Sequence, residues 1–231
     1  MKEEIIKRFQ FYATPEDMAY KLVNMTLNPF LNKSVRILEP SAGQGSIIKA
    51  IENWHLNEAK HLHIKEVTAV EFMNQNAALL KKEIRKYFFP VEVIESDFLK
   101  YDQYINYFDY VIANPPFSKG QDIEHFYKMY EVCKPGGTIT SIMSVSWLNN
   151  TSKKYKDFRE WLGIAKDETW VDKINRKCAG KGLANYSGLR ITENGNKEKV
   201  IIETYEAGAF DESGTSVITC IIQIKKNDVS W

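Results

Sequence analysis

The segment Val35-Arg-Ile-Leu-Glu-Pro-Ser-Ala-Gly-Gln-Gly45 is the clearest indication of the fold class, because it joins a short apolar run to a glycine-containing turn. Val35 to Leu38 predicts a strand, and Ser46 to Asn53 predicts the helix that follows the turn. Glycines let the backbone turn sharply and approach a ligand closely. The helix amino terminus behind them favours an anionic group. This order of elements is typical of the start of a parallel α/β sheet.

The same alternation continues along the chain. Further strands are predicted at Glu66–Val70, Val91–Ile94, Phe108–Ala113 and Thr138–Val145, and helices at Asn74–Tyr87 and Ile123–Cys133. Repeated strand-helix units imply a parallel sheet with helices on both faces. The β-rich runs Val200–Tyr205 and Val217–Ile224 predict an antiparallel hairpin at one edge of the sheet. The expected fold class is therefore α/β, with a seven-stranded, mostly parallel sheet and a C-terminal hairpin.

Composition limits the class of protein. The 231 residues, 44% of them hydrophobic, fit one domain over 1–231, and the net charge of +1 argues against a uniformly basic surface. The charged N-terminal residues 1–10 do not resemble a signal peptide, and no run is long enough for a membrane helix, so we expect a cytoplasmic protein with no membrane partner. The three cysteines, Cys133, Cys178 and Cys220, are far apart. Their spacing favours neither a disulfide framework nor a zinc site, and no metal site is predicted.

Acidic residues end two of the predicted strands, at the edge where parallel sheets bind ligands. Glu71 follows the second strand, where a carboxylate can accept hydrogen bonds from both hydroxyls of a ribose. Asp97 follows the third and can accept one from an adenine amino group. Phe72, Met73 and Phe98 are candidates to enclose the adenine ring. Each residue alone could be a solvated acid or a core aromatic, but their regular spacing after the glycine turn favours a nucleoside site.

A second turn, Asn114-Pro115-Pro116-Phe117, directly follows the fourth predicted strand. Two prolines remove two backbone donors and make the turn rigid. An aromatic amine is a poor nucleophile because its lone pair is delocalised. The side-chain oxygen of Asn114 and the carbonyl of Pro115 can bind its two N–H groups and favour a localised lone pair in the transition state. Phe117 can stack on a base that has left the duplex. The turn therefore predicts methylation of a planar NH2 group.

With these motifs in order, the chain resembles the class I S-adenosylmethionine-dependent methyltransferases, specifically the N6-adenine DNA methyltransferases with an Asn-Pro-Pro-Phe motif. Phe11 to Pro15 resembles their N-terminal cofactor motif, Leu38 to Gly45 their glycine-rich motif, and Ala207 to Lys226 their closing hairpin. The cofactor motifs precede the catalytic one, as in the γ-like order. The resemblance implies a Rossmann-like methyltransferase fold, S-adenosyl-L-methionine as cofactor, and double-stranded DNA with a flipped base as partner.

The resemblance also assigns the candidate residues. Those expected to bind the cofactor are Tyr12, Thr14, Glu39, Pro40, Ser41, Gly43, Gly45, Glu71, Phe72, Asp97, Phe98 and Asn114. Those expected to act in catalysis are Asn114, Pro115, Pro116 and Phe117. From the residues alone, Thr14 is a good N-cap for a helix that has Pro15 in its first turn, which explains this segment without any ligand.

A region between the fifth strand and the hairpin is the candidate for target recognition. Residues 147–199 form an expected insertion, in which Ser152 to Leu162 predicts a helix and Lys173 to Arg190, which contains no acidic residue, predicts a mobile basic loop. The expected nucleic-acid contacts are Lys173, Arg176, Lys177, Lys181 and Arg190. Many similar enzymes carry a large separate recognition domain. We therefore expect this basic loop, a homodimer or a recognition subunit to read the target.

Two alternatives remain for the acceptor and the role. Asn-Pro-Pro-aromatic turns also serve methyltransferases that act on RNA or on protein glutamine, although Phe117 favours nucleic acid. A catalytically silent subunit of a multisubunit modification system is the other alternative, and the intact Asn114 to Phe117 turn argues against it. Cytosine C5 chemistry would need a cysteine in that turn, whereas Cys133 lies on the predicted following helix.

Overall fold

The computed structural model describes residues 13–164, 185–205 and 218–228. Its strands are β1 (Ser34–Glu39), β2 (His63–Glu71), β3 (Val91–Glu95), β4 (Phe108–Ala113), β5 (Cys133–Ser144), β6 (Asn185–Ile191), β7 (Lys197–Tyr205) and β8 (Thr219–Lys225). Its α-helices are α2 (Glu16–Thr26), α3 (Ser46–Glu58), α4 (Asn74–Glu83), α5 (Gln121–Val132), α6 (Ser146–Asn149) and α7 (Lys153–Trp161). Short 3-10 turns are η1 (Ile84–Lys86), η2 (Phe98–Lys100) and η3 (Ser118–Gly120).

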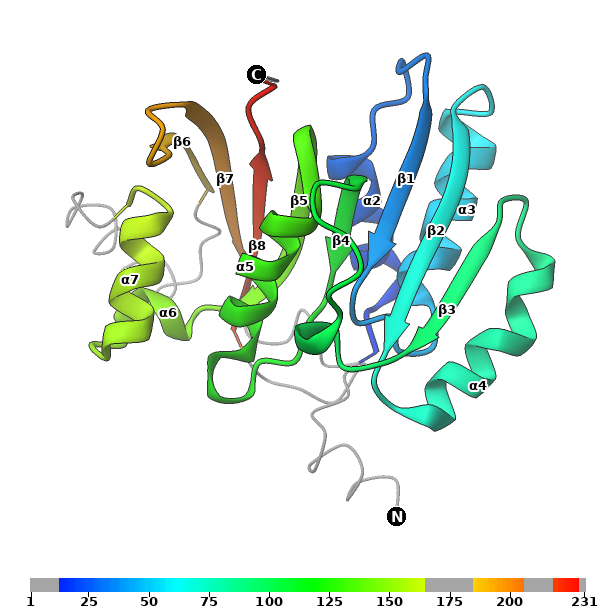
Figure 1. Ribbon diagram of the computed structural model, residues 1–231, viewed down its shortest axis with the longest axis horizontal. Helices are drawn as coiled ribbons and strands as arrows, with labels where there is room; N and C mark the ends of the chain where they lie inside the picture. Colours follow the sequence, from blue (N-terminus) through cyan, green and yellow to red (C-terminus); the bar gives the residue numbers. More distant parts are fainter. Residues whose placement is uncertain (1–12, 165–184, 206–217, 229–231) are drawn as a thin grey trace.

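The strands form one sheet in the order β3-β2-β1-β4-β5-β8-β7-β6 (Figure 1). The five strands from β3 to β5 pair in parallel, and β8, β7 and β6 pair antiparallel. The expected α/β fold with a mostly parallel sheet and an antiparallel C-terminal hairpin is confirmed. The described sheet has eight strands rather than seven. The additional strand is β6, which lies where the sequence predicted the last part of a mobile basic loop.

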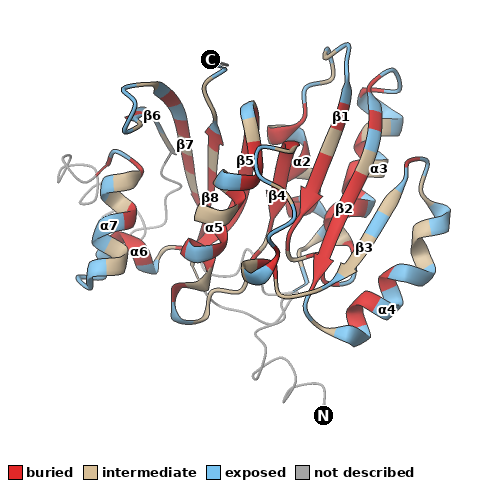
Figure 2. Cartoon of the chain, in the orientation of Figure 1, coloured by how far each residue is buried: buried red, intermediate tan, exposed pale blue. Residues whose placement is uncertain are grey.

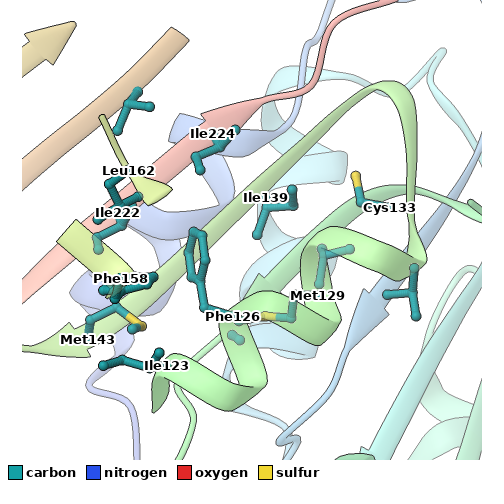
Figure 3. Packing of buried hydrophobic residues seen from close by; sticks show 14 of the residues in the cluster. Ile123, Phe126, Met129, Cys133, Ile139, Met143, Phe158, Leu162, Ile222 and Ile224 are labelled. Atoms are coloured by element: carbon teal, nitrogen blue, oxygen red, sulfur yellow. The ribbon is translucent and has the colours of Figure 1, made fainter. Parts of the chain in front are cut away.

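Helices cover both faces of the sheet, and each face has its own apolar core. One core joins α2, α3 and Leu80 of α4 to the inward residues of β1 and β2. The other joins α5, α6 and α7 to β5, β7 and β8. Figure 3 shows this second core, with Phe126 and Met129 of α5 packed towards Ile139 and Ile222. The central strands are buried along most of their length, whereas the outer surfaces of α4 and α7 are exposed (Figure 2).

The strand order reverses beside β1, because the chain runs outward from β1 through β2 to β3 and then returns to place β4 on the other side. At such a switch point the loops that leave two neighbouring strands diverge and open a crevice at their carboxyl ends. The glycine-rich turn leaves β1 and the Asn114 turn leaves β4. The topology therefore brings both motifs to one crevice.

The start of α2 differs from the sequence prediction. The residue that caps α2 is Pro15, and no side chain makes a capping hydrogen bond there. Thr14 is therefore not the N-cap, and its hydroxyl accepts a hydrogen bond from Asn114 instead. Among the residues that the structure describes, none of the helices combines the length and the apolar character needed to cross a membrane.

Candidate functional site

A cavity of about 370 Å³ opens at the carboxyl edge of the sheet. Its wall comes from the segment before α2, from the ends of β1, β2, β3 and β4, and from the first turns of α5. The predicted site residues that line it are Thr14, Glu39, Pro40, Ser41, Gly43, Glu71, Phe72, Asp97, Phe98, Asn114, Pro115, Pro116 and Phe117. A volume of this size is within the range of small-molecule sites, which is about 300–1,000 Å³.

The two glycines of the first turn have different roles. Gly43 lines the cavity with a positive φ of 54°, which brings its backbone N–H next to the end of β2. Gly45 does not line the cavity. It caps α3 with a φ of 84°, and an added Cβ would lie 2.7 Å from Cδ1 of Leu80. Gly45 therefore shapes the turn and lets α4 approach α3, whereas the sequence assigned it to the cofactor.

Glu39 ends β1 in a buried position, with only 2% of its surface exposed. Its Oε2 atom has no hydrogen-bond partner among the described residues, although it lies in the cavity wall. Burial, and secondly the nearby Glu71 carboxyl, raise the pKa of Glu39 well above its ordinary value. A buried carboxylate oxygen without a partner is costly, so a cationic or donor group in the cavity would stabilise the ionised form of Glu39.

Glu71 connects the end of β2 to the glycine turn. Its two carboxylate oxygens accept hydrogen bonds from the backbone N–H groups of Gly43 and Met73, each at 2.7 Å. Burial raises the pKa of Glu71, and these two hydrogen bonds oppose that shift. A carboxylate oxygen can accept more than one hydrogen bond, so Glu71 holds the turn and still presents acceptor sites to the cavity.

The other predicted nucleoside residues lie on the same side of the cavity. Asp97 accepts a hydrogen bond from the N–H of Leu99 at 3.0 Å, which starts η2 and orients the carboxylate. Phe98 is buried in the wall, whereas Phe72 is 63% exposed at the rim. The two aromatic rings therefore come to the cavity from different depths.

His125 is a cavity residue that the sequence reasoning missed. It is buried on α5, its Nδ1 lies 3.4 Å from the hydroxyl of Ser41, and its ring lies 5.5 Å from the ring of Phe98. Burial lowers the pKa of His125 to about 4, so the ring is neutral at physiological pH. The helix after a parallel strand begins at the carboxyl edge, and a polar residue in its first two turns was a signal that could have identified it.

The Asn114 turn forms another part of the wall. The Nδ2 of Asn114 donates a hydrogen bond to the hydroxyl of Thr14 at 3.1 Å, and both side chains line the cavity. Pro115 is buried, while Pro116 and Phe117 are half-buried. Phe117 also packs against the core beneath α2 and α3, which anchors one side of its ring. The turn thus holds an amide and two proline carbonyls beside the acidic strand ends.

Comparisons with known proteins agree with this arrangement. The chain is 30% identical over 222 residues to the type II methyltransferase M.AccI of Acinetobacter calcoaceticus, and the match covers 93% of this chain and 37% of that protein. A solved structure, the type I restriction-modification methyltransferase subunit of Streptococcus thermophilus, superposes with a TM-score of 0.59 at 14% identity, over 94% of this chain and 45% of that one. No protein-family model matches.

A third protein carries the cofactor. The structure of TYW2 from M. jannaschii in complex with AdoMet superposes with a TM-score of 0.50 at 12% identity, over 96% of this chain and 80% of that one. The chain therefore has the Rossmann-like fold of these methyltransferases, and its sequence likeness to M.AccI covers most of this chain. It spans about a third of the length of M.AccI.

The structure places one predicted nucleic-acid contact, Arg190, in a buried ion pair. Arg190 lies on β6, only 4% exposed, and its Nε is 3.1 Å from a carboxylate oxygen of the equally buried Glu198. Its guanidinium also lies 3.6 Å from the ring centroid of Trp161. Arg190 joins β6 and β7 to α7, so it is not available to a nucleic acid. The other predicted contacts, Lys173, Arg176, Lys177 and Lys181, and the cofactor residue Tyr12 lie outside the described residues.

Cys133 is the cysteine nearest in sequence to the Asn114 turn. Cys133 begins β5, rather than lying on the preceding helix as predicted, and it is fully buried. Burial raises the pKa of Cys133 to about 12, so it stays a thiol. This cysteine cannot support the covalent chemistry that methylation at cytosine C5 requires.

Proposed function

We propose that this chain transfers a methyl group from S-adenosylmethionine to the exocyclic N6 amine of adenine in DNA. One observation carries the proposal. Asn114 and Pro115 leave β4 at the switch point and line the same cavity as the acidic ends of β1, β2 and β3. An amine bound at the turn would therefore lie next to a nucleoside cofactor bound by the acids.

The wall of the cavity suits this cofactor. S-adenosylmethionine carries a positively charged ammonium and a positively charged sulfonium, and its sulfonium supplies the methyl group that is transferred. Glu39 offers a buried carboxylate oxygen that has no partner among the described residues. Glu71 would accept hydrogen bonds from the ribose hydroxyls, and Asp97 would accept one from the adenine amino group. Phe72 and Phe98 would contact the adenine ring.

The catalytic turn would activate the target amine without a strong base. The Oδ1 of Asn114 and the carbonyl oxygen of Pro115 accept its two N–H groups, which favours a tetrahedral nitrogen with a localised lone pair. When bound, S-adenosylmethionine would supply the electrophilic methyl group that this nitrogen accepts. The alkylated nitrogen is acidic, so one of its protons leaves to solvent.

Two observations favour DNA as the acceptor. The relative M.AccI is a type II methyltransferase, and the Streptococcus thermophilus structure is a subunit of a restriction-modification system. Phe117 lines the cavity next to the amide and can stack on a flipped base. We propose one methyltransferase domain over 1–231, in which residues 147–199 contribute to target recognition, with a recognition subunit or a second copy as partner.

A substrate panel tests the function. The purified chain should transfer labelled methyl groups to unmethylated plasmid, and mass spectrometry of the digested nucleosides should show N6-methyladenine. Labelled RNA or glutamine-containing protein with no label on double- or single-stranded DNA would assign the same chemistry to another acceptor. No transfer to any of these by the chain alone would favour the silent-subunit alternative.

A substitution tests the catalytic assignment. Asn114→Ala should abolish transfer while S-adenosylmethionine still binds, because the amide acts on the amine rather than mainly on the cofactor. Asn53→Ala, at an exposed position of α3, is the matched control and should behave as wild type. Retained turnover in Asn114→Ala would show that the catalytic residue is elsewhere.

A further inference from the structure

Thr14 and Asn114 are 100 residues apart in the sequence and are joined at 3.1 Å by a hydrogen bond from the amide nitrogen to the hydroxyl. Thr14 belongs to the segment before α2, and Asn114 follows β4. The sequence explains Thr14 as a helix cap or as a cofactor ligand. The first role is absent, because α2 has no side-chain cap.

The contact with Thr14 matters because the side chain of Asn114 ends in a carboxamide. A carboxamide has a donor end and an acceptor end of nearly equal size, and a half-turn about its last torsion exchanges them. The proposed reaction needs the acceptor end, because an NH2 group facing the target amine would oppose donor to donor. When Oδ1 faces the amine, Nδ2 requires an acceptor, and the Thr14 hydroxyl oxygen is an acceptor at hydrogen-bond distance.

We propose that Thr14 is a positioning residue that holds the Asn114 amide with its oxygen towards the target amine, an inference that rests on the proposed function. Thr14→Val keeps the shape of the side chain and removes the acceptor. The amide can then turn, and Nδ2 loses a partner in a half-buried site. Misorientation of a catalytic group typically costs about 10-fold to 100-fold in rate.

The test separates positioning from cofactor binding. Thr14→Val should lower kcat at least about 10-fold while the Kd for S-adenosylmethionine changes less than about 3-fold, and Thr14→Ser should recover most of kcat. Thr26→Val removes a hydroxyl that bonds within α2, to Leu22 at 2.6 Å, and should leave kcat unchanged. An unchanged kcat in Thr14→Val, or a weaker cofactor Kd with normal kcat, would overturn the proposal.

A measurement without turnover keeps this result independent of the proposed function. In a protein with ¹⁵N-labelled asparagine, the side-chain NH2 of Asn114, assigned by its absence in Asn114→Ala, should exchange slowly with water. Thr14→Val should accelerate that exchange, whereas Thr26→Val should not. An exchange rate that is equal in all three proteins would refute the orienting contact, even if the wild type methylated DNA.

A second inference concerns lysines beside the catalytic turn. Lys154 of α7 donates a hydrogen bond to the carbonyl oxygen of Lys119 at 3.0 Å and to Glu124 at 2.7 Å. Lys119 itself is exposed, two residues after Phe117, with a φ of 54°. This contact joins the start of α7 to the turn that would hold the flipped base. Figure 1 shows α6 and α7 beside α5 at the edge of the molecule.

The lysine surface, defined as Lys119, Lys153, Lys154 and Lys156, gathers four lysines from η3 and the first turns of α7, with Glu124 and Asp157 as acidic neighbours. Lys153 and Lys156 are exposed on the first turns of α7. Two of the four lysines have an acidic partner, Lys153 with Asp157 and Lys154 with Glu124. Exposed ion pairs of this kind are weak, so these lysines can exchange a carboxylate for a phosphate.

We infer that the lysine surface binds the phosphates of duplex DNA that flank the flipped base, which rests on the proposed function and gives α7 the role that the sequence assigned to Lys173–Arg190. Each lysine that contacts a phosphate releases counterions, so log K falls with log salt by about 0.9 for each contact. The lysine surface should therefore contribute a measurable part of this slope. The test therefore measures the affinity for duplex DNA and does not depend on turnover.

Fluorescence anisotropy with a random duplex of about 30 base pairs measures that slope. The triple variant Lys119→Gln/Lys153→Gln/Lys156→Gln should reduce its magnitude by about 2 to 3 and leave the Kd for S-adenosylmethionine unchanged. The control Lys60→Gln/Lys65→Gln/Lys82→Gln removes exposed lysines near the amino ends of the strands and should leave the slope as in the wild type. An unchanged slope in the first triple variant, or a change seen only with RNA, would overturn the inference. A changed slope in a chain that methylates no DNA would contradict the proposed function but would still support DNA binding by the lysine surface.

Discussion

The carboxylate of Glu71 accepts the backbone N–H of Gly43 at 2.7 Å, across 28 residues of sequence. This hydrogen bond joins the end of β2 to the glycine turn after β1, and the other carboxylate oxygen binds the N–H of Met73. Glu71 therefore shapes the cavity in addition to its expected contact with a ribose. A single change in its hydrogen-bonding ability should affect both roles.

Glu71→Gln replaces an acceptor oxygen by an NH2 group, which would face the N–H of Gly43 or Met73. Opposing two donors in a buried site costs about 1–3 kcal/mol. We expect the affinity for S-adenosylmethionine to fall about 10-fold or more, as measured by isothermal titration calorimetry. Glu95→Gln, at the exposed end of β3, is the control and should bind as wild type. An equal affinity in both variants would contradict this role of Glu71.

Phe117 offers a ring at the cavity, and stacking on a base is worth about 1–3 kcal/mol. Phe117→Leu should raise the KM for DNA or lower kcat, with a combined loss of about 10-fold in kcat/KM. Phe117→Tyr keeps the ring and should retain most of the activity. The Kd for S-adenosylmethionine should be the same in all three proteins, and a kcat/KM for Phe117→Leu equal to wild type would exclude stacking.

His125 predicts a pH dependence of stability. Burial lowers its pKa from 6.5 to about 4, so the unfolded chain binds a proton at a higher pH than the folded chain. The stabilisation from the neutral ring is complete above pH 6.5 and is lost as pH falls towards 4, by up to about 3 kcal/mol.

Urea unfolding of wild type and His125→Gln at several pH values measures this effect. Because glutamine does not titrate, the free energy of unfolding of the wild type should fall relative to that of the variant between pH 6.5 and about 4. His61→Gln, at an exposed position, should follow the wild type. A difference between wild type and His125→Gln that stays constant with pH would show that the folded pKa is not lowered.

Because Arg190 is buried in an ion pair, its substitution should lower the stability of the protein rather than its DNA binding. Arg190→Met would leave Glu198 buried without its cationic partner, although the hydroxyl of Tyr130 still donates to it at 2.8 Å. Breaking a buried ion pair from one side costs about 3–5 kcal/mol. The exposed Lys199→Met on the neighbouring strand β7 should cost less than about 0.5 kcal/mol in urea unfolding. A stable Arg190→Met with weakened duplex binding would restore the role that the sequence gave to Arg190.

The α/β class and the order of the motifs could be predicted from local sequence patterns alone. The parallel strands are buried on both faces, so they appear as continuous apolar runs such as Phe108–Ala113, which the structure confirms as β4. The turns after β1 and β4 could also be predicted, because their glycines and prolines act locally on the backbone. From the rule that ligands bind at the carboxyl ends of the strands, the strand-end acids and the Asn114 turn could be expected together, and they line one cavity.

The contacts of individual side chains could not be predicted without the folded arrangement of the chain. Nothing near Thr14 in the sequence indicates Asn114, and nothing near Arg190 indicates Glu198 and Trp161, because these contacts join segments that fold together only through the sheet. The same holds for His125, whose burial between Ser41 and Phe98 gives it a lowered pKa. A sequence pattern records local backbone preference and burial, whereas pairing, desolvation and charge neutralisation depend on neighbours that only the packed chain brings together.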